Sequence, residues 1–380
     1  MSPYKILIAS VLKPLKDART YYRFTYSLRE TNKYQINIIG FSSKKEPDEE
    51  NIRFYPIFNY KRNLFSRWLT GLTVIAQIKK VKPGIIIIST WELLPAAIIG
   101  KIIFGGKLVY DVQENTFANI QFNRTMADWK KPFAKGVVAV SESLAKPFID
   151  CYFFAEQCYI HELPKFKPYV VLENKFYGQL ASRRKPIQLN SEKIKFLISG
   201  TITEVYGILD AVEWFKVILK IRPNSQLTII GHCPLQGFKK KIIEACDVIP
   251  AITLNLSEHP VPYGKILESY HQADVVLMPY HQIPSIKDKI PSKLYESLAL
   301  GKPCLFSPNP VWRSITEKYR AGMEMKFKDL EHVTKNFENF LKETFYTTLP
   351  GDELLWKSEE GKFLEIMEKL RVDVRGKNVE

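Results

Sequence analysis

Short apolar runs alternate with segments of helical spacing along most of the chain. In its first part the runs have the length of buried parallel strands, and we predict strands at 5–9, 35–39, 84–88, 107–111 and 136–140. The segments between them predict helices at 19–30, 72–80 and 95–104, with Ser141 as the N-cap of a further helix. This alternation predicts a parallel sheet covered by helices.

A polar, basic stretch at 182–190 interrupts the pattern and predicts a linker. The alternation then restarts, with strands predicted at 194–198, 226–230, 251–255, 273–278 and 302–306 and helices at 209–219, 263–272, 292–300 and 357–370. We therefore predict an α/β protein of two Rossmann-like domains, 1–182 and 191–355, with a ligand cleft between them. Residues 356–380 are predicted as a C-terminal helix and tail, the helix crossing back to the first domain.

Composition excludes several classes of protein. Hydrophobic residues make up 46% and charged residues 25% of the 380, which is ordinary for a folded, water-soluble protein. The five cysteines contain no CxxC pair and the six histidines show no metal spacing, so we expect neither a metal nor a disulfide framework. The first residues lack a signal-peptide pattern, and no apolar stretch is long enough to span a bilayer, so we expect a cytoplasmic protein.

Positive charge is concentrated in one half of the chain. Residues 1–190 carry 29 Lys and Arg against 15 Asp and Glu, a net charge of +14, whereas residues 191–380 carry only +1. This asymmetry predicts an anionic partner, such as a membrane surface or a phosphorylated acceptor. The basic, aromatic run Tyr60–Trp68 is a candidate membrane contact. A lysine-rich, solvated surface is the alternative explanation, and no known nucleic-acid-reading element is present.

The most informative window is residues 285–303, SIKDKIPSKLYESLALGKP. It follows a predicted buried strand and enters a helix, where Pro291 is compatible with a helix start, Ser292 with its cap and Gly301 with its end. The N–H groups of that helix end suit a pyrophosphate. Positive charge is supplied by Lys287, Lys289 and Lys293. Glu296 lies one turn inside, where a carboxylate can accept hydrogen bonds from a ribose diol. An ordinary amphipathic helix is the alternative.

This window resembles the donor-binding motif of GT-B glycosyltransferases of family 4, in which two acidic residues stand eight positions apart. Here they are Asp288 and Glu296, and the following Ser-Leu-Ala-Leu-Gly-Lys-Pro is also similar to that family. The resemblance implies that Glu296 holds the nucleotide ribose, that Asp288 lies near the donor sugar and pyrophosphate, and that both serve catalysis. It further implies the GT-B fold.

Two weaker segments support the same resemblance. The segment 198–207 is similar to the first loop of the family's donor domain, where Gly200 and Thr201 are expected to approach the donor phosphates. That loop normally carries an Arg and a Lys, but Thr201 and Tyr206 occupy approximately those positions. We therefore expect Lys289 and Lys293 to supply much of the positive charge.

The second segment, 109–115, is similar to the family's Asp-x-His-Glu segment. We expect Asp111, Glu114 and Asn115 to orient the acceptor, although the same residues are equally suited to capping the loop. Arg19, in the loop after the first strand, is a candidate for gripping an acceptor phosphate.

The resemblance implies a retaining, metal-independent hexosyltransferase that needs no cofactor. Its donor would be a UDP- or GDP-sugar, and its acceptor a lipid-linked or surface glycan of polysaccharide biosynthesis. The expected location is cytoplasmic, peripheral at the inner face of the membrane. Two alternatives stay open: a GT-B-shaped sugar-nucleotide epimerase, and a degenerate partner subunit without catalytic activity. The sugar, linkage, acceptor and oligomeric state are not determined by the sequence.

Overall fold

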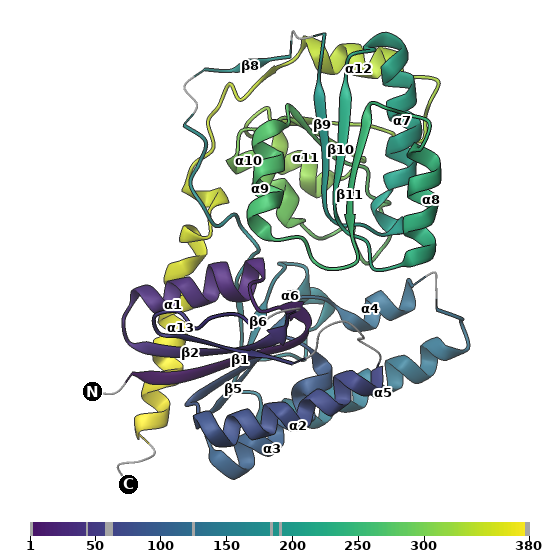
Figure 1. Ribbon diagram of the computed structural model, residues 1–380. Coiled ribbons are helices and arrows are strands. Elements are labelled where there is room, and N and C mark those ends of the chain that lie inside the picture. The colour runs from purple at the N-terminus through teal and green to yellow at the C-terminus, as the bar shows by residue number, and fades with distance from the viewer. Residues whose placement is uncertain are drawn as a thin grey trace. The chain divides into compact units, whose positions relative to one another are not determined.

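The chain folds into two compact units. The computed structural model describes residues 3–42, 45–57, 64–123, 126–182, 185–189 and 192–376. Unit 1 consists of Met1–Tyr177 together with Trp356–Glu380, and unit 2 of Gly178–Leu355. Each is an α/β unit with its own parallel sheet (Figure 1), which is the predicted fold class.

Unit 1 is built on a seven-stranded parallel sheet in the spatial order β3-β2-β1-β4-β5-β6-β7. The chain adds β2 and β3 on one side of β1 and returns to build β4 on the other, so the strand order reverses between β1 and β4. The strands are β1 (Tyr4–Pro14), β2 (Tyr34–Phe41), β3 (Ile52–Pro56), β4 (Ile85–Ile88), β5 (Lys107–Val112), β6 (Cys151–Phe154) and β7 (Tyr169–Val171).

Helices cover both faces of this sheet, because successive strand residues point to opposite sides. Ile6 and Ile8 of β1 pack with a π-helical segment η1 (Ala18–Thr25), α1 (Tyr26–Glu30) and α13 (Lys357–Gly376). The last helix therefore returns to unit 1, as predicted. Leu7 and Ala9 face the other layer, which consists of α2 (Leu64–Val81), α3 (Leu94–Phe104), α5 (Lys130–Ala145) and α6 (Tyr159–Glu162). The shorter elements are η2 (Trp91–Leu93), α4 (Thr116–Gln121) and η3 (Lys146–Phe148).

Unit 2 contains a six-stranded parallel sheet in the order β11-β10-β9-β12-β13-β14, reversing between β9 and β12. The strands are β9 (Lys195–Thr201), β10 (Gln226–His232), β11 (Ile252–Ser257), β12 (Val275–Met278), β13 (Cys304–Phe306) and β14 (Gly322–Glu324). A two-stranded antiparallel sheet pairs β8 (Ile187–Gln188) with β15 (Thr344–Phe345), so part of the predicted linker is in fact a short strand.

Aromatic packing attaches one helical layer to the sheet of unit 2. Phe196 of β9 contacts Trp214 and Phe337, whose rings come from α7 (Ile208–Ile221) and α12 (Val333–Lys342). In Figure 1, α8 (Gln236–Cys246) lies beside α7, while α9 (Tyr263–Gln272), α10 (Ser292–Ala299) and α11 (Pro310–Glu317) lie on the opposite side of the sheet. The turns η4 (Glu204–Tyr206) and η5 (Asp352–Leu354) complete the unit.

One predicted strand is wrong. Residues 136–140 lie inside α5, and Ser141 is an interior residue of that helix whose hydroxyl donates to the carbonyl of Trp91 rather than capping. The run of Val and Ala suits either element, because a short apolar run without alternation does not distinguish a strand from a helix. The strand expected there is instead β6, formed by the aromatic segment Cys151–Phe154.

Two further observations bear on the predicted membrane contact. The run Tyr60–Trp68 lies outside the described residues up to position 63, and its remainder begins the backbone of α2. None of the helices in the described part of the chain has both the length and the apolar character needed to cross a bilayer.

Candidate functional site

The predicted donor-binding residues gather at the reversal point of the unit 2 sheet. In open α/β sheets ligands bind beyond the carboxyl ends of the strands at such a point. Gly200 and Thr201 end β9, whereas Lys289, Pro291 and Ser292 belong to the segment that leads from β12 into α10. The fold therefore brings together two segments about ninety residues apart in sequence.

Gly200 and Lys293 are in direct contact. Gly200 has a φ of 98°, a conformation that favours glycine. A methyl group at this position would overlap the end of the Lys293 side chain, so the ammonium lies against the backbone at the end of β9. The pairing places a positive charge at the strand end.

The N-terminus of α10 differs in detail from the prediction. Pro291 is the N-cap residue, in an extended conformation, and Ser292 is the first helical residue, so Ser292 does not cap the helix. The carbonyl of Pro291 accepts the amide of Leu294 at 2.9 Å. No side chain of the cap residue competes for the N–H groups of this helix end. Its partial positive charge suits an anion.

Glu296 is buried among tyrosines. The residue is 3% exposed, and its Oε1 accepts a hydrogen bond from the hydroxyl of Tyr263 at 3.2 Å. The hydroxyl of Tyr270 donates to the carbonyl of Lys293 at 3.5 Å. Burial, and then the charge of Glu296, raise the pKa of Tyr270 well above its usual value. Burial, with Tyr206 and Glu296, does the same for the pKa of Tyr280.

These phenols therefore stay protonated and can donate hydrogen bonds. The sequence did not reveal them, because tyrosines at helical spacing also fit an ordinary core face.

The segment after β12 is held by α11. The side-chain amide of Asn309 donates to the carbonyl of Lys287 at 2.8 Å, and the indole of Trp312 donates to the carbonyl of Lys289 at 2.6 Å. Lys287 and Asp288 have exposed side chains. Their backbone is thus fixed while their charges face solvent. In the sequence, Asn309 and Pro310 could have indicated that a helix starts here, because Asn caps helices and Pro suits their first turn.

The segments after β9 and β12 are also tied to each other. The amide of His281 donates to the carbonyl of Val205 at 2.9 Å, and its Nε2 lies 2.7 Å from Oδ2 of Asp210 on α7. The ring of Tyr206 packs on that of Tyr280, with centroids 4.5 Å apart. Tyr206 stands approximately where the resembled family has a charged residue. Here its ring makes an aromatic contact with the segment that follows β12.

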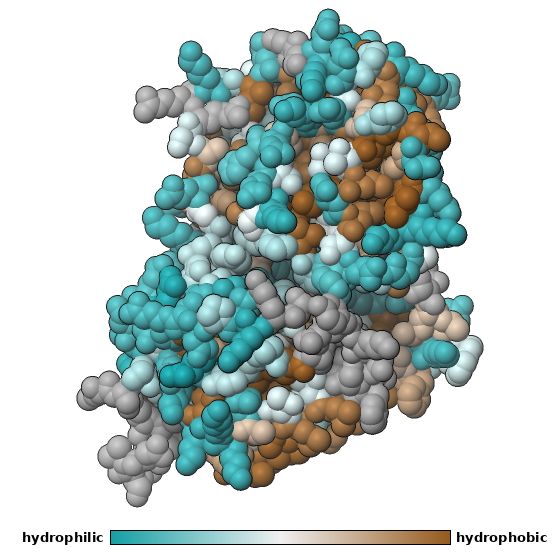
Figure 2. All heavy atoms as spheres, in the orientation of Figure 1, coloured by the Kyte–Doolittle hydropathy of each residue, from teal (hydrophilic) through white to brown (hydrophobic). Residues whose placement is uncertain are grey.

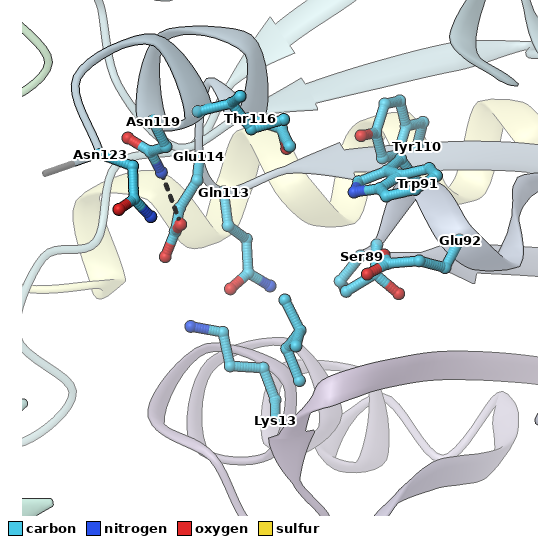
Figure 3. Close-up of a pocket in the computed structure, with 13 residues that line it drawn as sticks. Lys13, Ser89, Trp91, Glu92, Tyr110, Gln113, Glu114, Thr116, Asn119 and Asn123 are labelled. Atoms are coloured by element: carbon cyan, nitrogen blue, oxygen red, sulfur yellow. Dashed lines mark hydrogen bonds between the residues drawn. The ribbon is translucent and has the colours of Figure 1, made fainter. Parts of the chain in front are cut away.

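Unit 1 has a pocket of about 180 Å³ at its own reversal point, beside the ends of β1 and β4 (Figure 3). Glu114, one of the predicted acceptor residues, lines it and accepts a hydrogen bond from the side-chain amide of Asn119 at 2.8 Å. Carboxylate, amide and indole groups together suit a hydroxylated ligand. The lining residues are Leu12, Lys13, Ser89, Thr90, Trp91, Glu92, Tyr110, Gln113, Glu114, Thr116, Asn119, Ile120 and Asn123.

The other predicted acceptor residues are used by the fold. Arg19 and Asp111 are 3% and 0% exposed and form an ion pair at 2.8 Å. Arg19 also donates to the carbonyl of Leu172 at 2.7 Å, so its guanidinium is enclosed by protein. Asn115 caps α4 by accepting the amide of Ala118 at 3.0 Å. That contact is the capping role left open by the sequence.

A titratable pair lies behind the pocket. Tyr110 lines the pocket, and its hydroxyl donates to Oε1 of Glu142 on α5 at 3.1 Å. Burial raises the pKa of Glu142 to about 7, although the hydrogen bond from Tyr110 opposes this. A carboxyl whose pKa is raised toward neutrality therefore lies behind the pocket wall, beside Tyr110. Across the described ranges, no group of three or more His, Cys, Asp or Glu is placed to hold a metal ion.

Comparisons with known proteins bear on the fold of the chain and on the family of one segment. Residues 181–348 match the family model of glycosyl transferases group 1. Sucrose-phosphate synthase from Thermosynechococcus elongatus is similar at a TM-score of 0.67 and 13% identity, covering 97% of this chain and 100% of that one. HepE from Anabaena, solved with UDP-glucose, is similar at a TM-score of 0.63 and 13% identity, covering 96% and 99%.

An enzyme of another class shares the fold. The UDP-GlcNAc 2-epimerase from Methanocaldococcus jannaschii is similar at a TM-score of 0.54 and 13% identity, covering 97% of this chain and 99% of that one. No curated protein matches the chain. The chain therefore has the GT-B fold, and the match to the glycosyl transferases group 1 model lies within unit 2.

Proposed function

We propose that this protein is a retaining glycosyltransferase that moves a hexose from a UDP- or GDP-sugar to a lipid-linked or surface glycan. The observation that carries the proposal is the convergence of Gly200, Lys293 and Glu296 at the reversal point of unit 2, within the matched segment. HepE, solved with UDP-glucose, supports a nucleotide-sugar as the donor.

The chemistry proposed for this site is stabilisation of the departing diphosphate. Glu296 would accept hydrogen bonds from the ribose hydroxyls, exchanging part of its contact with Tyr263. Lys293, Lys289 and the N-terminus of α10 would face the pyrophosphate, so negative charge that develops as the glycosidic bond breaks would be stabilised. Asp288 would orient the sugar. No metal or cofactor is required by this scheme.

The acceptor is proposed to bind in the pocket of unit 1. Its wall offers Glu114, Gln113 and Asn119 as hydrogen-bonding groups and Trp91 as an apolar platform, a combination that suits a saccharide. A product assembled in polysaccharide biosynthesis, at the cytoplasmic face of a membrane, fits the positive charge of the first half of the chain.

The proposal is tested by ligand-dependent thermal shifts with a panel of UDP- and GDP-sugars. A ligand at one hundred times its dissociation constant stabilises the folded state by about 2.7 kcal/mol. A donor found in this way is then incubated with glycan acceptors, and the anomeric configuration of the product is read by NMR. Absence of any nucleotide-sugar shift would contradict the proposal.

An epimerase is the second candidate, favoured by the similarity to the enzyme from Methanocaldococcus jannaschii. It would convert a nucleotide-sugar into its epimer without an acceptor, and the same NMR experiment would detect this. A partner subunit without catalytic activity is suggested by the uncharged Thr201 and Tyr206. Such a subunit would bind the donor but would not convert it, whether or not an acceptor is present.

A further inference from the structure

The outer side of α5 is apolar where a surface helix is normally polar. Trp129, immediately before the helix, and Phe133 are each 77% exposed, and Val140 and Leu144 are 60% and 66% exposed. Their spacing of four, seven and four residues places them along one stripe of the helix. The exposed positions inside α5 are otherwise small or weakly polar apart from Lys130 at its start. We name these four residues the α5 stripe.

The neighbouring helices extend this surface. α2, α3 and α5 lie side by side on one face of the unit 1 sheet, and their inner sides share one core. Ile102 and Ile103 of α3 are 64% and 62% exposed, and Leu72 of α2 is 67% exposed. In Figure 2 hydrophobic residues gather along the lower edge of unit 1, over α2 and α3. Large apolar side chains that are exposed together on neighbouring helices mark an interaction site.

Basic residues frame the apolar surface. Lys79 and Lys80 end α2 and are exposed, and the ammonium of Lys130 lies 5.1 Å from the centre of the Trp129 ring. In sequence, α2, α3 and α5 contain seven Lys and Arg, and their one acidic residue is Glu142. Asp128, just before the helix, pairs with Lys131 at 2.7 Å. The surface is therefore cationic at its border and apolar at its centre.

This combination selects a lipid surface over a protein partner. Protein interfaces are depleted of lysine. Bilayer interfaces accept Trp at the headgroup level, aliphatic side chains beneath it and lysines that reach back to anionic lipids. We propose that the α2–α3–α5 face of unit 1, led by the α5 stripe, docks on a membrane containing anionic lipids. Docking on a membrane would bring the protein to the proposed lipid-linked acceptor. The proposal rests on the proposed function only for the identity of that acceptor, because docking itself requires no turnover.

The test is co-sedimentation of the full chain with phosphatidylcholine vesicles, with and without phosphatidylglycerol. Wild type should bind the anionic vesicles, and less so as salt rises, because exposed charges are screened. Combined Trp129→Ser, Phe133→Ser and Leu144→Ser should lower the partition coefficient about tenfold or more, because insertion of three large apolar groups is lost. The matched control is Val248→Ser, an 82% exposed apolar residue of unit 2, which should bind as wild type does.

A spectroscopic measurement locates the contact. Trp214, Trp312 and Trp356 are fully buried, so their emission should change little on docking. In a background carrying Trp68→Phe and Trp91→Phe, the emission of Trp129 should shift to the blue and be quenched by brominated lipid, and adding Trp129→Phe should remove that quenched component while the protein still binds. Quenching that persists in Trp129→Phe would overturn the assignment to α5.

Two further outcomes separate this inference from its rivals. Wild type that binds no vesicles but forms a dimer, lost in the triple Ser variant, would overturn the inference and assign the face to a second copy of the chain. The triple variant should bind nucleotide as wild type does, and Glu296→Ala should keep vesicle binding. Vesicle binding without any nucleotide binding would leave the docking surface standing and contradict the proposed function alone.

Discussion

Arg19 and Asp111 form a buried ion pair in which Nε and Nη2 of the guanidinium lie 2.9 and 2.8 Å from Oδ1 of the carboxylate. Arg19 belongs to η1 and Asp111 to β5, and the carbonyl of Leu172, after β7, accepts a third hydrogen bond. The pair therefore joins three segments of unit 1. Because both charges are out of water, each depends on the other for compensation.

Arg19→Ala should destabilise unit 1 strongly. Removing one partner of a buried pair leaves an uncompensated charge and costs about 3–5 kcal/mol. Urea unfolding measures the change. The control is Arg53→Ala, because the ion pair of Arg53 with Asp48 is about half exposed and should contribute less than about 1 kcal/mol. If Arg19→Ala were as stable as this control and acceptor affinity fell instead, Arg19 would serve the acceptor, as the sequence first suggested.

Gly200→Ala should weaken both folding and diphosphate binding. The φ of 98° is strained for alanine, and the added methyl would displace the side chain of Lys293. We expect the variant to lose at least about 1 kcal/mol of stability. We also expect it to bind UDP more weakly than the wild-type protein does, as measured by calorimetry. Gly237→Ala is the matched control, since a methyl there meets nothing within 4 Å. Equal behaviour of the two variants would show that Lys293 does not need this contact.

The buried carboxyl of Glu142 should make stability depend on pH. Its pKa in the folded state is about 7, against 4.5 in an exposed carboxyl, so the folded state holds a proton that the unfolded chain releases between these values. Stability is therefore lost as pH rises through this window. Glu142→Gln should remove the loss and gain about 3 kcal/mol relative to wild type near pH 8, with little gain near pH 4. Urea unfolding across this pH range measures the stability difference between Glu142→Gln and wild type. A difference that stays constant with pH would contradict the raised pKa of Glu142.

The sequence predicted the fold well where each element carried its own pattern. Nine of the ten predicted strands and the helix at Tyr263–Gln272 were located because buried parallel strands are short and apolar and that helix is amphipathic. The segment 136–140 failed because its valines fit a strand locally, and only packing on the sheet decides that the residues form part of α5.

The residues of the candidate site were likewise predictable where they are contiguous in sequence and not where they come from distant segments. The Asp288–Glu296 window was identified because its residues are contiguous. The contacts that support it were missed because they join distant segments: Tyr263 to Glu296, and Asn309 and Trp312 to the backbone before α10. The apolar outer side of α5 was missed for a related reason. Its sequence is that of an ordinary core segment, and exposure becomes visible only once the helix is placed.

The roles proposed for Glu296 and Lys293 can be separated with two ligands. If Glu296 holds the ribose, Glu296→Ala should weaken uridine and UDP alike, by roughly 1.5–3 kcal/mol, because hydrogen bonds to a charged acceptor are lost. If Lys293 faces the pyrophosphate, Lys293→Ala should weaken UDP more than uridine. Calorimetric titration of both ligands, or of guanosine and GDP where those bind, gives the four affinities.

Two controls make this comparison specific. Lys240→Ala removes a lysine of α8 whose side chain is 80% exposed, and it should change neither affinity. Tyr263→Phe removes only the hydroxyl that donates to Glu296 and should have a smaller effect than Glu296→Ala, because the carboxylate remains to bind the ribose. Equal losses for uridine and UDP in Lys293→Ala would show that Lys293 supports the end of β9 structurally. Unchanged affinities in Glu296→Ala would remove the carboxylate from the nucleotide site.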